Sequence, residues 1–255
     1  MTIDSDTDLD GMRRVGRLVA QTLERMRAAV RPGITTRDID RVAEDFARAG
    51  GARSAPRLAY DFPGFTCISV NDAIVHGVPG PRVIRPGDVV KLDVTLELGG
   101  YMADSAVTVL VAPASSDARR LQRAARVAFN QALRFARAGH RLSDIGRAVD
   151  ASVRRDGFAV VRELTGHGIG RRIHEDPSVP NWEDPAARLI LAEGLVIAVE
   201  PMVTATPARV VEGADGWTLR THNRALAVHH EHTIVLGHGA PHVLNVAYRC
   251  GRATP

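Results

Sequence analysis

Asp93 and Asp104 are the first residues of the chain whose type and spacing could hold a metal ion. Apolar and polar residues alternate strictly over 89–98, which predicts a strand with one buried face and Asp93 on the other face. The glycines at 99–100 suit a two-residue hairpin turn, after which the chain returns as a strand over 101–111. With that turn Leu98 faces Tyr101 and Thr95 faces Asp104. Asp93 and Asp104 are then diagonal neighbours, with backbones about 7–8 Å apart, and their carboxylates can converge on one ion.

The structural alternative for this pair is that Asp93 faces solvent and Asp104 lies in a turn, which is the commoner situation for charged residues. Aspartate is disfavoured in strands, however, and two carboxylates on one face repel each other unless a positive charge lies between them. The pair therefore favours a cation site.

Two glutamates in the second half of the chain repeat this arrangement. Glu200 ends the apolar stretch 195–199 and lies 107 positions after Asp93. Glu231 stands within 229–235, where apolar residues follow it and where a free carboxylate would be costly to bury. We expect each half of the chain to contribute two acidic groups to one cleft.

Two histidines accompany these carboxylates. His167 lies among the three glycines of 165–170, which allow the backbone to approach a site closely, and His174 follows seven residues later. A histidine in a glycine-rich loop is usually only a loop residue, so this segment alone is weak evidence for a site.

Two helices are predicted before the first strand-rich stretch. Apolar residues at helical spacing mark the first helix over 8–30. Thr35, with Asp38 three residues later, predicts the start of a second helix, and the glycines at 50–51 predict its end. Strands then follow to about position 111.

The same order of elements occurs again in the second half. Apolar residues within 121–135 mark a third helix, which Gly139 ends, and Ser143 predicts the start of a fourth. Glycine, aspartate, isoleucine and arginine recur with equal spacing in 33–41 and 139–147, which lie 106 positions apart.

This repeat predicts one domain with two related parts. A chain of 255 residues is long for one domain and short for two, and folding buries about three-quarters of its extended surface. We expect a single catalytic domain over 1–255, made of two α/β halves, roughly 8–111 and 116–248, with pseudo-twofold symmetry.

The composition is that of an ordinary globular protein, with 45% hydrophobic and 24% charged residues. The acidic N-terminal segment lacks the features of a secretory signal and no apolar run is long enough to span a bilayer, so we expect a cytoplasmic protein. Cys67 and Cys250, the only cysteines, exclude a cysteine-based zinc site. The net charge of +4 comes from arginines scattered among acidic residues, which predicts a mixed surface rather than a specific nucleic-acid site.

Five motifs in order give the chain a family resemblance: CISVND-x3-HG (67–77), KLDVT-x8-DS (91–105), GHGIG-x3-HEDP (166–177), EPMV (200–203), and DGWT with HEHTIV (215–235). On these motifs the chain resembles the type I methionine aminopeptidases over nearly its whole length. The resemblance implies the pita-bread fold that prolidases and aminopeptidase P share, in which two α/β halves with a curved antiparallel sheet surround a dimetal cleft.

The resemblance also implies which side chains are the metal ligands: Asp93, Asp104, His167, Glu200 and Glu231. In this family pattern Asp104 and Glu231 bridge two divalent ions, while Asp93 binds one ion and His167 with Glu200 the other. Four carboxylates offset the charge of two divalent cations, and oxygen ligands with one imidazole suit Mn, Fe or Co. The sequence leaves open which metal is used and whether a monovalent cation binds near Asn71.

The expected reaction is removal of the N-terminal methionine from nascent polypeptides, preferably before a small second residue. Two ions lower the pKa of a shared water and polarise the scissile carbonyl, and Glu200 is our candidate for the proton shuttle to the leaving amine. His76 and His174 match the family histidines that touch the substrate. Transient ribosome contact is compatible with the sequence, and a monomer is expected.

The methionine slot that the resemblance implies is lined by Tyr60, Phe62, Cys67, Trp217 and Ile173. The chain departs from the common pattern, since relatives often have an aromatic residue in place of Ile173 and a tyrosine in place of Phe62. The loop 57–63 is also about one residue shorter. The smaller Ile173 is expected to loosen the slot.

Two other functions compete with this interpretation. Prolidase and aminopeptidase P share the ligand set but usually have a sizeable domain before the catalytic one, whereas only about 60 residues precede the first site motif here. Some relatives of the fold are non-enzymatic scaffolds that have lost their metal ligands, whereas all five ligand positions are kept in this chain.

Overall fold

The computed structural model describes residues 1–246, so Cys250 and the last two positions of the second predicted half lie outside the described residues. The helices are α1 (Asp6–Ala29), α2 (Thr36–Ala49), α3 (Ala55–Tyr60), α4 (Ser116–Leu133) and α5 (Leu142–Arg155). The strands of the main sheet are β1 (Arg53–Ser54), β2 (Cys67–Val70), β4 (Val89–Leu98), β5 (Tyr101–Leu110), β7 (Gly166–Gly168), β8 (Glu175–Val179), β9 (Val196–Val199), β14 (Glu231–Val235) and β15 (His242–Val243).

Two smaller sheets complete the described strands. One consists of β6 (Ala159–Val160), β10 (Met202–Thr204) and β13 (Ala227–His229), and the other of β3 (Ala73–Val75), β11 (Val210–Glu212) and β12 (Leu219–Thr221). Within residues 1–246, no helix has both the length and the apolar character that crossing a membrane requires.

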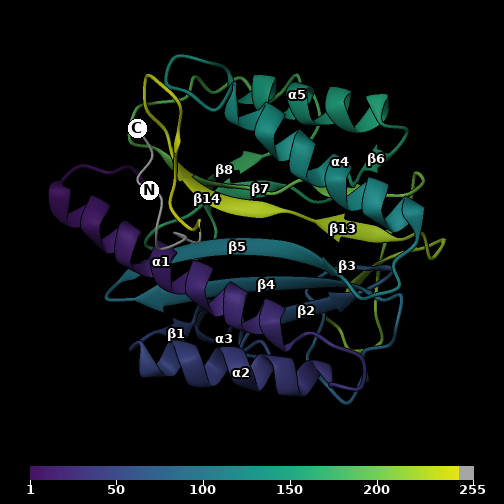
Figure 1. The fold of residues 1–255 in the computed structure, drawn as a ribbon. Coiled ribbons are helices and arrows are strands. Elements are labelled where there is room, and N and C mark those ends of the chain that lie inside the picture. The colour runs from purple at the N-terminus through teal and green to yellow at the C-terminus, as the bar shows by residue number, and fades with distance from the viewer. Residues whose placement is uncertain (247–255) are drawn as a thin grey trace, which may run out of the picture.

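The main sheet is curved and antiparallel, and it runs through both halves of the chain. Its strand order is β1-β4-β5-β14-β9-β7-β8, and the pairing of β5 with β14 joins the two halves. Helices α1 and α2 cover the part formed by β4 and β5, whereas α4 and α5 cover the part formed by the second half (Figure 1). The predicted α/β architecture is therefore confirmed.

Each half has its own apolar core. In the first half, Met12 of α1 and Ile39 of α2 pack in one cluster with Leu92 of β4. In the second half, Ile145 of α5 and Ile197 of β9 belong to a separate cluster. The polar groups between the two halves therefore lie between two well-packed apolar cores.

The helix starts follow the predicted capping residues in the first half but not in the second. Thr35 and Asp38 form the expected capping box at the start of α2. The predicted start of the fourth helix at Ser143 is wrong, because Arg141 is the N-cap of α5 and its backbone N–H donates to Asp144 at 3.2 Å. Arg141 lacks a capping side chain, so its role could not be read from its residue type.

Several features recur at the predicted offset between the halves. Gly33 and Gly139 both have positive φ, 90° and 87° respectively. An isolated β-bridge joins Thr35 to Val83, and another joins Arg141 to Ile190 at the equivalent place. Equivalent bridges are what two related halves would have. The common origin of the halves and the single-domain boundaries stay predictions of the sequence.

The β4–β5 hairpin has the predicted register, with Leu98 opposite Tyr101 and Thr95 opposite Asp104. The prediction that β4 has only one buried face is wrong, however, since Lys91 and Glu97 on its polar face are 1% and 6% exposed. Lys91 Nζ donates to the Asn71 backbone oxygen at 2.7 Å, and Glu97 pairs with Arg53. The polar side chains are buried because they have polar partners.

The helix α3 lies in a stretch that was predicted to contain strands and a loop. Ser54 caps it by accepting a hydrogen bond from the Arg57 backbone N–H at 3.3 Å, and a proline stands in its first turn. Six residues are too few to show a helical period, so the pattern could not reveal this helix.

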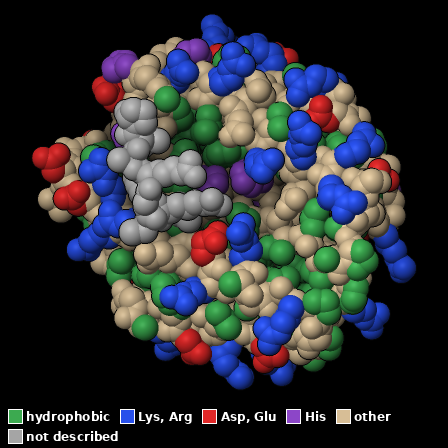
Figure 2. Space-filling view, in the orientation of Figure 1, with side chains coloured by type: hydrophobic (Ala, Val, Ile, Leu, Met, Phe, Trp, Pro, Cys, Tyr) green, Lys and Arg blue, Asp and Glu red, His purple; other side chains and the backbone are tan. Residues whose placement is uncertain are grey.

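The surface agrees with the predicted mixture of charges. Figure 2 shows basic side chains around the whole visible face, with acidic side chains among them. Many of these groups form ion pairs, such as Arg154 with Asp150 and Arg48 with Glu44.

Candidate metal centre and active site

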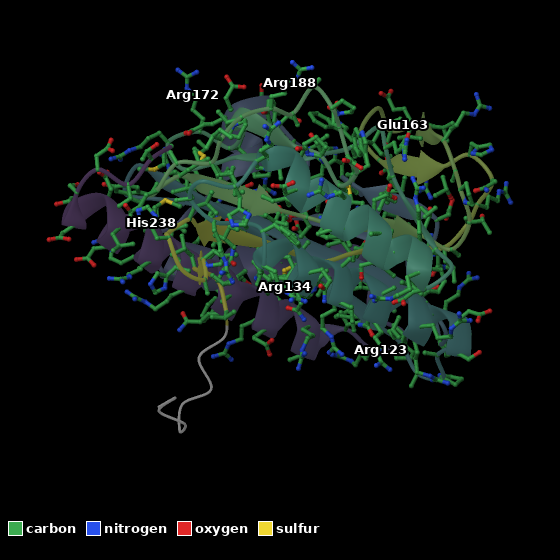
Figure 3. All side chains as sticks on the ribbon, turned by 90° about the horizontal axis from the view of Figure 1, so that it is seen from above. Arg123, Arg134, Glu163, Arg172, Arg188 and His238 are labelled. Atoms are coloured by element: carbon green, nitrogen blue, oxygen red, sulfur yellow. The ribbon has the colours of Figure 1, made fainter. Side chains whose placement is uncertain are left out.

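A cavity of about 810 Å³ lies where the two halves meet. Seven residues predicted to form the site are among those that line it: His76, Asp93, Asp104, His167, His174, Glu200 and Glu231. Glu163 and Arg172 also line it, and they lie at the edge of the molecule opposite Arg123 and Arg134 (Figure 3).

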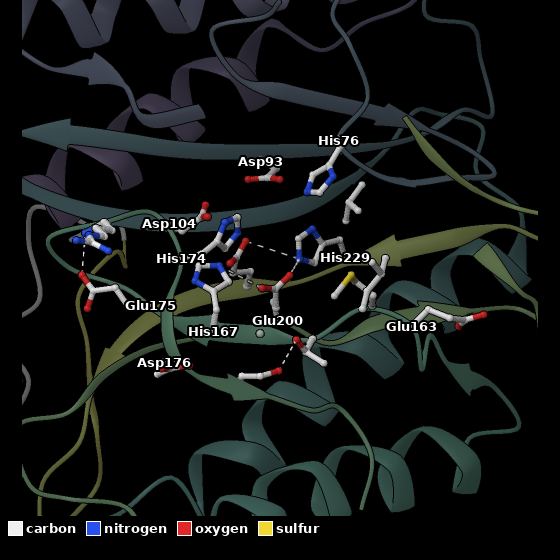
Figure 4. A pocket seen from close by; sticks show the side chains of 18 residues that line it. His76, Asp93, Asp104, Glu163, His167, His174, Glu175, Asp176, Glu200 and His229 are labelled. Carbon is white, nitrogen blue, oxygen red and sulfur yellow. Dashed lines mark hydrogen bonds and ion pairs between the residues drawn. The ribbon is translucent and has the colours of Figure 1, made fainter. Parts of the chain in front are cut away.

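The five predicted ligands come from five different elements. Asp93 is on β4, Asp104 on β5, His167 on β7 and Glu231 on β14, and Glu200 directly follows β9. Asp93 and His76 point into the cavity from the first half, and His167 and Glu200 point toward them from the second half (Figure 4). The site thus depends on the whole sheet rather than on one loop.

Ligand atoms of Asp104, His167 and Glu231 lie within 4.8 Å of one another. His167 Nε2 is also 3.5 Å from Glu200 Oε1. A second such triplet among the described residues consists of Glu200, His229 and Glu231. Asp93 belongs to neither triplet, but it lines the same cavity. Burial raises the pKa of Asp93 well above its ordinary value, and the neighbouring Asp104 and Glu200 carboxylates raise it further.

The electrostatics of this cluster suit a divalent cation. Burial raises the pKa of Glu200 and Glu231 well above the ordinary value, and repulsion from Asp104 adds to the effect. Asp104 Oδ1 and Glu231 Oε1 are buried and have no hydrogen-bond partner in the described part of the chain. A buried carboxylate oxygen without a partner is costly, and a cation at this position would satisfy both oxygens.

His167 is prepared to bind a cation through Nε2. Its Nδ1 lies 2.8 Å from the Gly168 backbone oxygen, so an Nδ1–H donates there and leaves the Nε2 lone pair free. Burial lowers the pKa of His167 to about 3, which keeps the imidazole neutral. The residues present therefore fit a divalent metal on oxygen and imidazole ligands.

The glycines beside His167 allow the close approach that the sequence predicted. A Cβ on Gly166 would lie 2.4 Å from the Ala198 backbone oxygen, and a Cβ on Gly168 would lie 2.1 Å from that of Asp176. Since any side chain at these positions would push the neighbouring strands apart, glycine is required to keep His167 inside the cluster.

His174 and His76 lie beside the ligand cluster. The rings of His174 and His167 are 4.3 Å apart, and Tyr60 Oη is 2.6 Å from His174 Nδ1. The Glu175 carboxylate accepts from the backbone N–H groups of Arg171 and Arg172 at 2.7 Å, which orders the loop before His174. His76 lines the cavity with a φ of 56°, and burial lowers its pKa to about 4.

The five residues predicted for the methionine slot fall into smaller groups. Phe62 and Trp217 pack edge to face with ring centroids 5.2 Å apart, and Cys67 pairs with Asp93 across β2 and β4. Tyr60 and Ile173 line a separate cavity of about 220 Å³ beside His174. None of the five lines the large cavity, whose apolar lining residues are Val75, Leu164 and Met202.

The sequence interpretation overlooked one residue of the cluster, His229. Its side chain is 2% exposed, and its Nε2 lies 3.3 Å from Glu200 Oε2 and 3.7 Å from Glu231 Oε2. Burial lowers its pKa to about 4. The strand pattern alone would not have established this, because His229 ends β13 and Glu231 begins β14, in a different sheet.

These features define a metal-dependent hydrolase site, and comparison with known proteins identifies the family. The chain matches metallopeptidase family M24 over residues 10–238 and belongs to this family. The cleft is accordingly the divalent-metal site of a peptidase.

Two similar proteins have a narrower name. Methionine aminopeptidase 2 of Bacillus subtilis is 39% identical over 96% of this chain and 99% of its own. A methionine aminopeptidase of Staphylococcus epidermidis is 38% identical over 94% of this chain and 97% of its own.

Solved structures confirm the pita-bread fold. A methionine aminopeptidase from Thermotoga maritima has a TM-score of 0.93 at 32% identity, covering 96% of this chain and 100% of that one. A prolidase from Pyrococcus furiosus has a TM-score of 0.79 at 19% identity, and the match covers 97% of this chain but only 66% of that one.

Proposed function

We propose that the protein is a methionine aminopeptidase of type I that removes the N-terminal methionine from nascent polypeptides before a small second residue. The observation that supports this most is the buried cluster of Asp104, His167, Glu200 and Glu231 in a chain whose relatives named methionine aminopeptidase match it almost end to end. Two divalent ions, with Mn, Fe and Co as the candidates, would be held by these four side chains and Asp93.

When bound, two divalent ions lower the pKa of water and polarise the scissile carbonyl. Glu200 is placed to take a proton from the attacking water and to deliver it to the leaving amine, because its carboxylate lies in the cavity between His167 and His229. Burial raises the pKa of Glu200 in the metal-free cluster, and bound cations would lower it again.

His174 and His76 are proposed to position the substrate. If the Tyr60 hydroxyl donates to His174 Nδ1, Nε2 of that neutral ring keeps its proton and can donate to the substrate amide. Burial lowers the pKa of His174, which favours the neutral form. His76, from the opposite wall of the cavity, would contact the departing part of the peptide.

The methionine side chain is proposed to enter beside His174, where Tyr60 and Ile173 already face a small cavity. Phe62 and Trp217 pack against each other, and Cys67 is buried beside Asp93. We propose that all five residues surround the methionine side chain as one slot after it has entered. We further propose a cytoplasmic monomer with at most transient ribosome contact.

We propose that no separate monovalent cation binds near Asn71, because the Lys91 ammonium already lies at the Asn71 backbone oxygen. Unfolding midpoints of the wild type are therefore expected to be equal in NaCl, KCl and choline chloride of the same ionic strength. Lys91→Met removes that ammonium and is expected to make the midpoint higher in NaCl or KCl than in choline chloride. A specific Na⁺ or K⁺ stabilisation of the wild type would contradict this proposal.

The function itself is tested by a comparison of two peptides. Metal-free protein, resupplied with Mn or Co, is expected to release methionine from Met-Ala-Ser and to leave an X-Pro dipeptide intact. Cleavage of the X-Pro peptide instead would favour a prolidase-like enzyme. Failure of either metal to produce any peptidase activity would favour a non-enzymatic binding module.

A further inference from the structure

We propose that His229 is a sixth protein ligand of the metal centre, so that each oxygen of Glu200 lies beside one ligating imidazole. This inference rests on the proposed dimetal function, and it adds a residue that the family resemblance does not supply. His229 lies beside Glu200 Oε2, the carboxylate oxygen that is not beside His167.

His229 lies about as close to the Glu200 carboxylate as His167 does. His167 Nε2 is 3.5 Å from Glu200 Oε1, and His229 Nε2 is 3.3 Å from Glu200 Oε2. Ligand atoms of Glu200, His229 and Glu231 lie within 4.8 Å of one another, forming a second triplet beside that of Asp104, His167 and Glu231. Ligands about 2.0–2.2 Å from one ion lie roughly 3 Å apart, which these separations approach.

The environment of the His229 ring leaves few other partners for it. Both ring nitrogens are buried, and neither has a hydrogen-bond partner among residues 1–246. A buried imidazole of purely structural function would normally have one. The groups nearest to Nε2 are the carboxylates of Glu200 and Glu231, so a cation between these groups would satisfy all three.

The backbone fixes the direction of this side chain. The His229 N–H donates to Thr108 Oγ1 at 3.0 Å, and the Thr108 hydroxyl donates to the His229 carbonyl at 2.8 Å. Thr108 belongs to β5, the strand that also provides Asp104. His229 is thus anchored to the first half while its ring faces ligands of the second (Figure 4).

The two neighbouring histidines, His230 and His232, have other partners than the metal-site carboxylates. The His230 ring packs edge to face on Phe129 with centroids 5.2 Å apart. His232 Nδ1 has the Asn245 side chain at 3.0 Å and the Ser105 hydroxyl at 3.2 Å. Of these three histidines, only His229 lines the cavity, and His230→Gln is therefore a matched control.

A second imidazole has a chemical consequence. Imidazole suits iron and the later divalent metals, whereas carboxylates alone suit manganese. His229 should therefore increase the affinity for cobalt more than the affinity for manganese. Its replacement should reduce that difference.

X-ray absorption of the cobalt-loaded wild type counts the imidazoles directly. The proposal predicts two imidazoles for each pair of cobalt ions, whereas His167 alone would give one. Calorimetric titration of metal-free His229→Gln with cobalt is expected to show an affinity more than about 100-fold lower, a larger loss than removal of a group that does not contact the metal usually causes, with a smaller loss for manganese. His230→Gln should match the wild type in both measurements.

Because a variant can fail for reasons of folding, the imidazole count is made on the wild type. In His167→Ala, one imidazole should remain in the cobalt spectrum. A count of one in the wild type and none in His167→Ala would overturn the role of His229 while leaving the dimetal function intact. Absence of cobalt binding to the wild type would instead contradict the proposed function itself.

Discussion

Glu231→Gln is expected to abolish stable binding of divalent metal and to lower peptide hydrolysis more than about a hundredfold. This loss exceeds what is usual for a residue that hydrogen-bonds to a ligand without contacting the metal. Glu231 belongs to both close triplets of the cavity, and its Oε1 has no other partner in the described residues. The neutral amide keeps the size of the side chain but removes a negative charge that helps to balance the cations. Metal content by mass spectrometry and turnover of Met-Ala-Ser provide the measurement.

The same substitution should not destabilise the metal-free protein. Burial and the neighbouring carboxylates raise the pKa of Glu231, so in the metal-free protein the neutral amide replaces a group that already favours its neutral form. Glu193→Gln, at an exposed ion pair with His238, is the matched control and should leave metal content and turnover unchanged. Unaltered metal binding in Glu231→Gln would show that the ion site lies elsewhere.

His174→Ala is expected to lower kcat by about 10²–10⁴-fold while metal content stays near that of the wild type. The His174 ring lies beside His167, and the Tyr60 hydroxyl is within hydrogen-bond distance of it. His174 belongs to neither of the two close ligand triplets. Its loss therefore removes the group that we propose to touch the substrate and spares the proposed ligands. Steady-state kinetics and metal analysis of the same sample provide the measurement.

His238→Ala is a suitable control for this variant, because that ring is exposed at a distant ion pair. Loss of metal from His174→Ala, with kcat per bound metal unchanged, would mean that His174 is a ligand rather than a substrate contact.

Local patterns in the sequence predicted the central hairpin correctly. Strict alternation and the two glycines after Leu98 determine which residues face each other, so Thr95 was predicted to lie opposite Asp104 and does. The convergence of Asp93 and Asp104 on one cavity followed from that register. Short-range geometry is enough where a hairpin positions both groups.

What the sequence missed depends on contacts between distant segments. Lys91 is polar and yet buried because Asn71, twenty positions earlier, provides its partner. The N-cap Arg141 is held by a bridge to Ile190, which no local pattern reveals. The helix α3 is too short to have a readable period.

His229 was missed for a different reason. The family resemblance implies five ligands and assigns no role to the histidine two positions before Glu231. The structure shows it buried against the Glu200 carboxylate. Its position depends on the junction between β13, which ends at His229, and β14, which begins at Glu231.

Anomalous diffraction at the manganese edge, from crystals grown with Mn²⁺, tests the central claim most directly. We predict two peaks about 3.5–4 Å apart in the cavity, within bonding distance of carboxylates from both halves, Asp93 and Asp104 from the first and Glu200 and Glu231 from the second. Manganese bound only outside this cavity, with Asp93 and Glu231 lacking a shared ion cluster, would contradict the account.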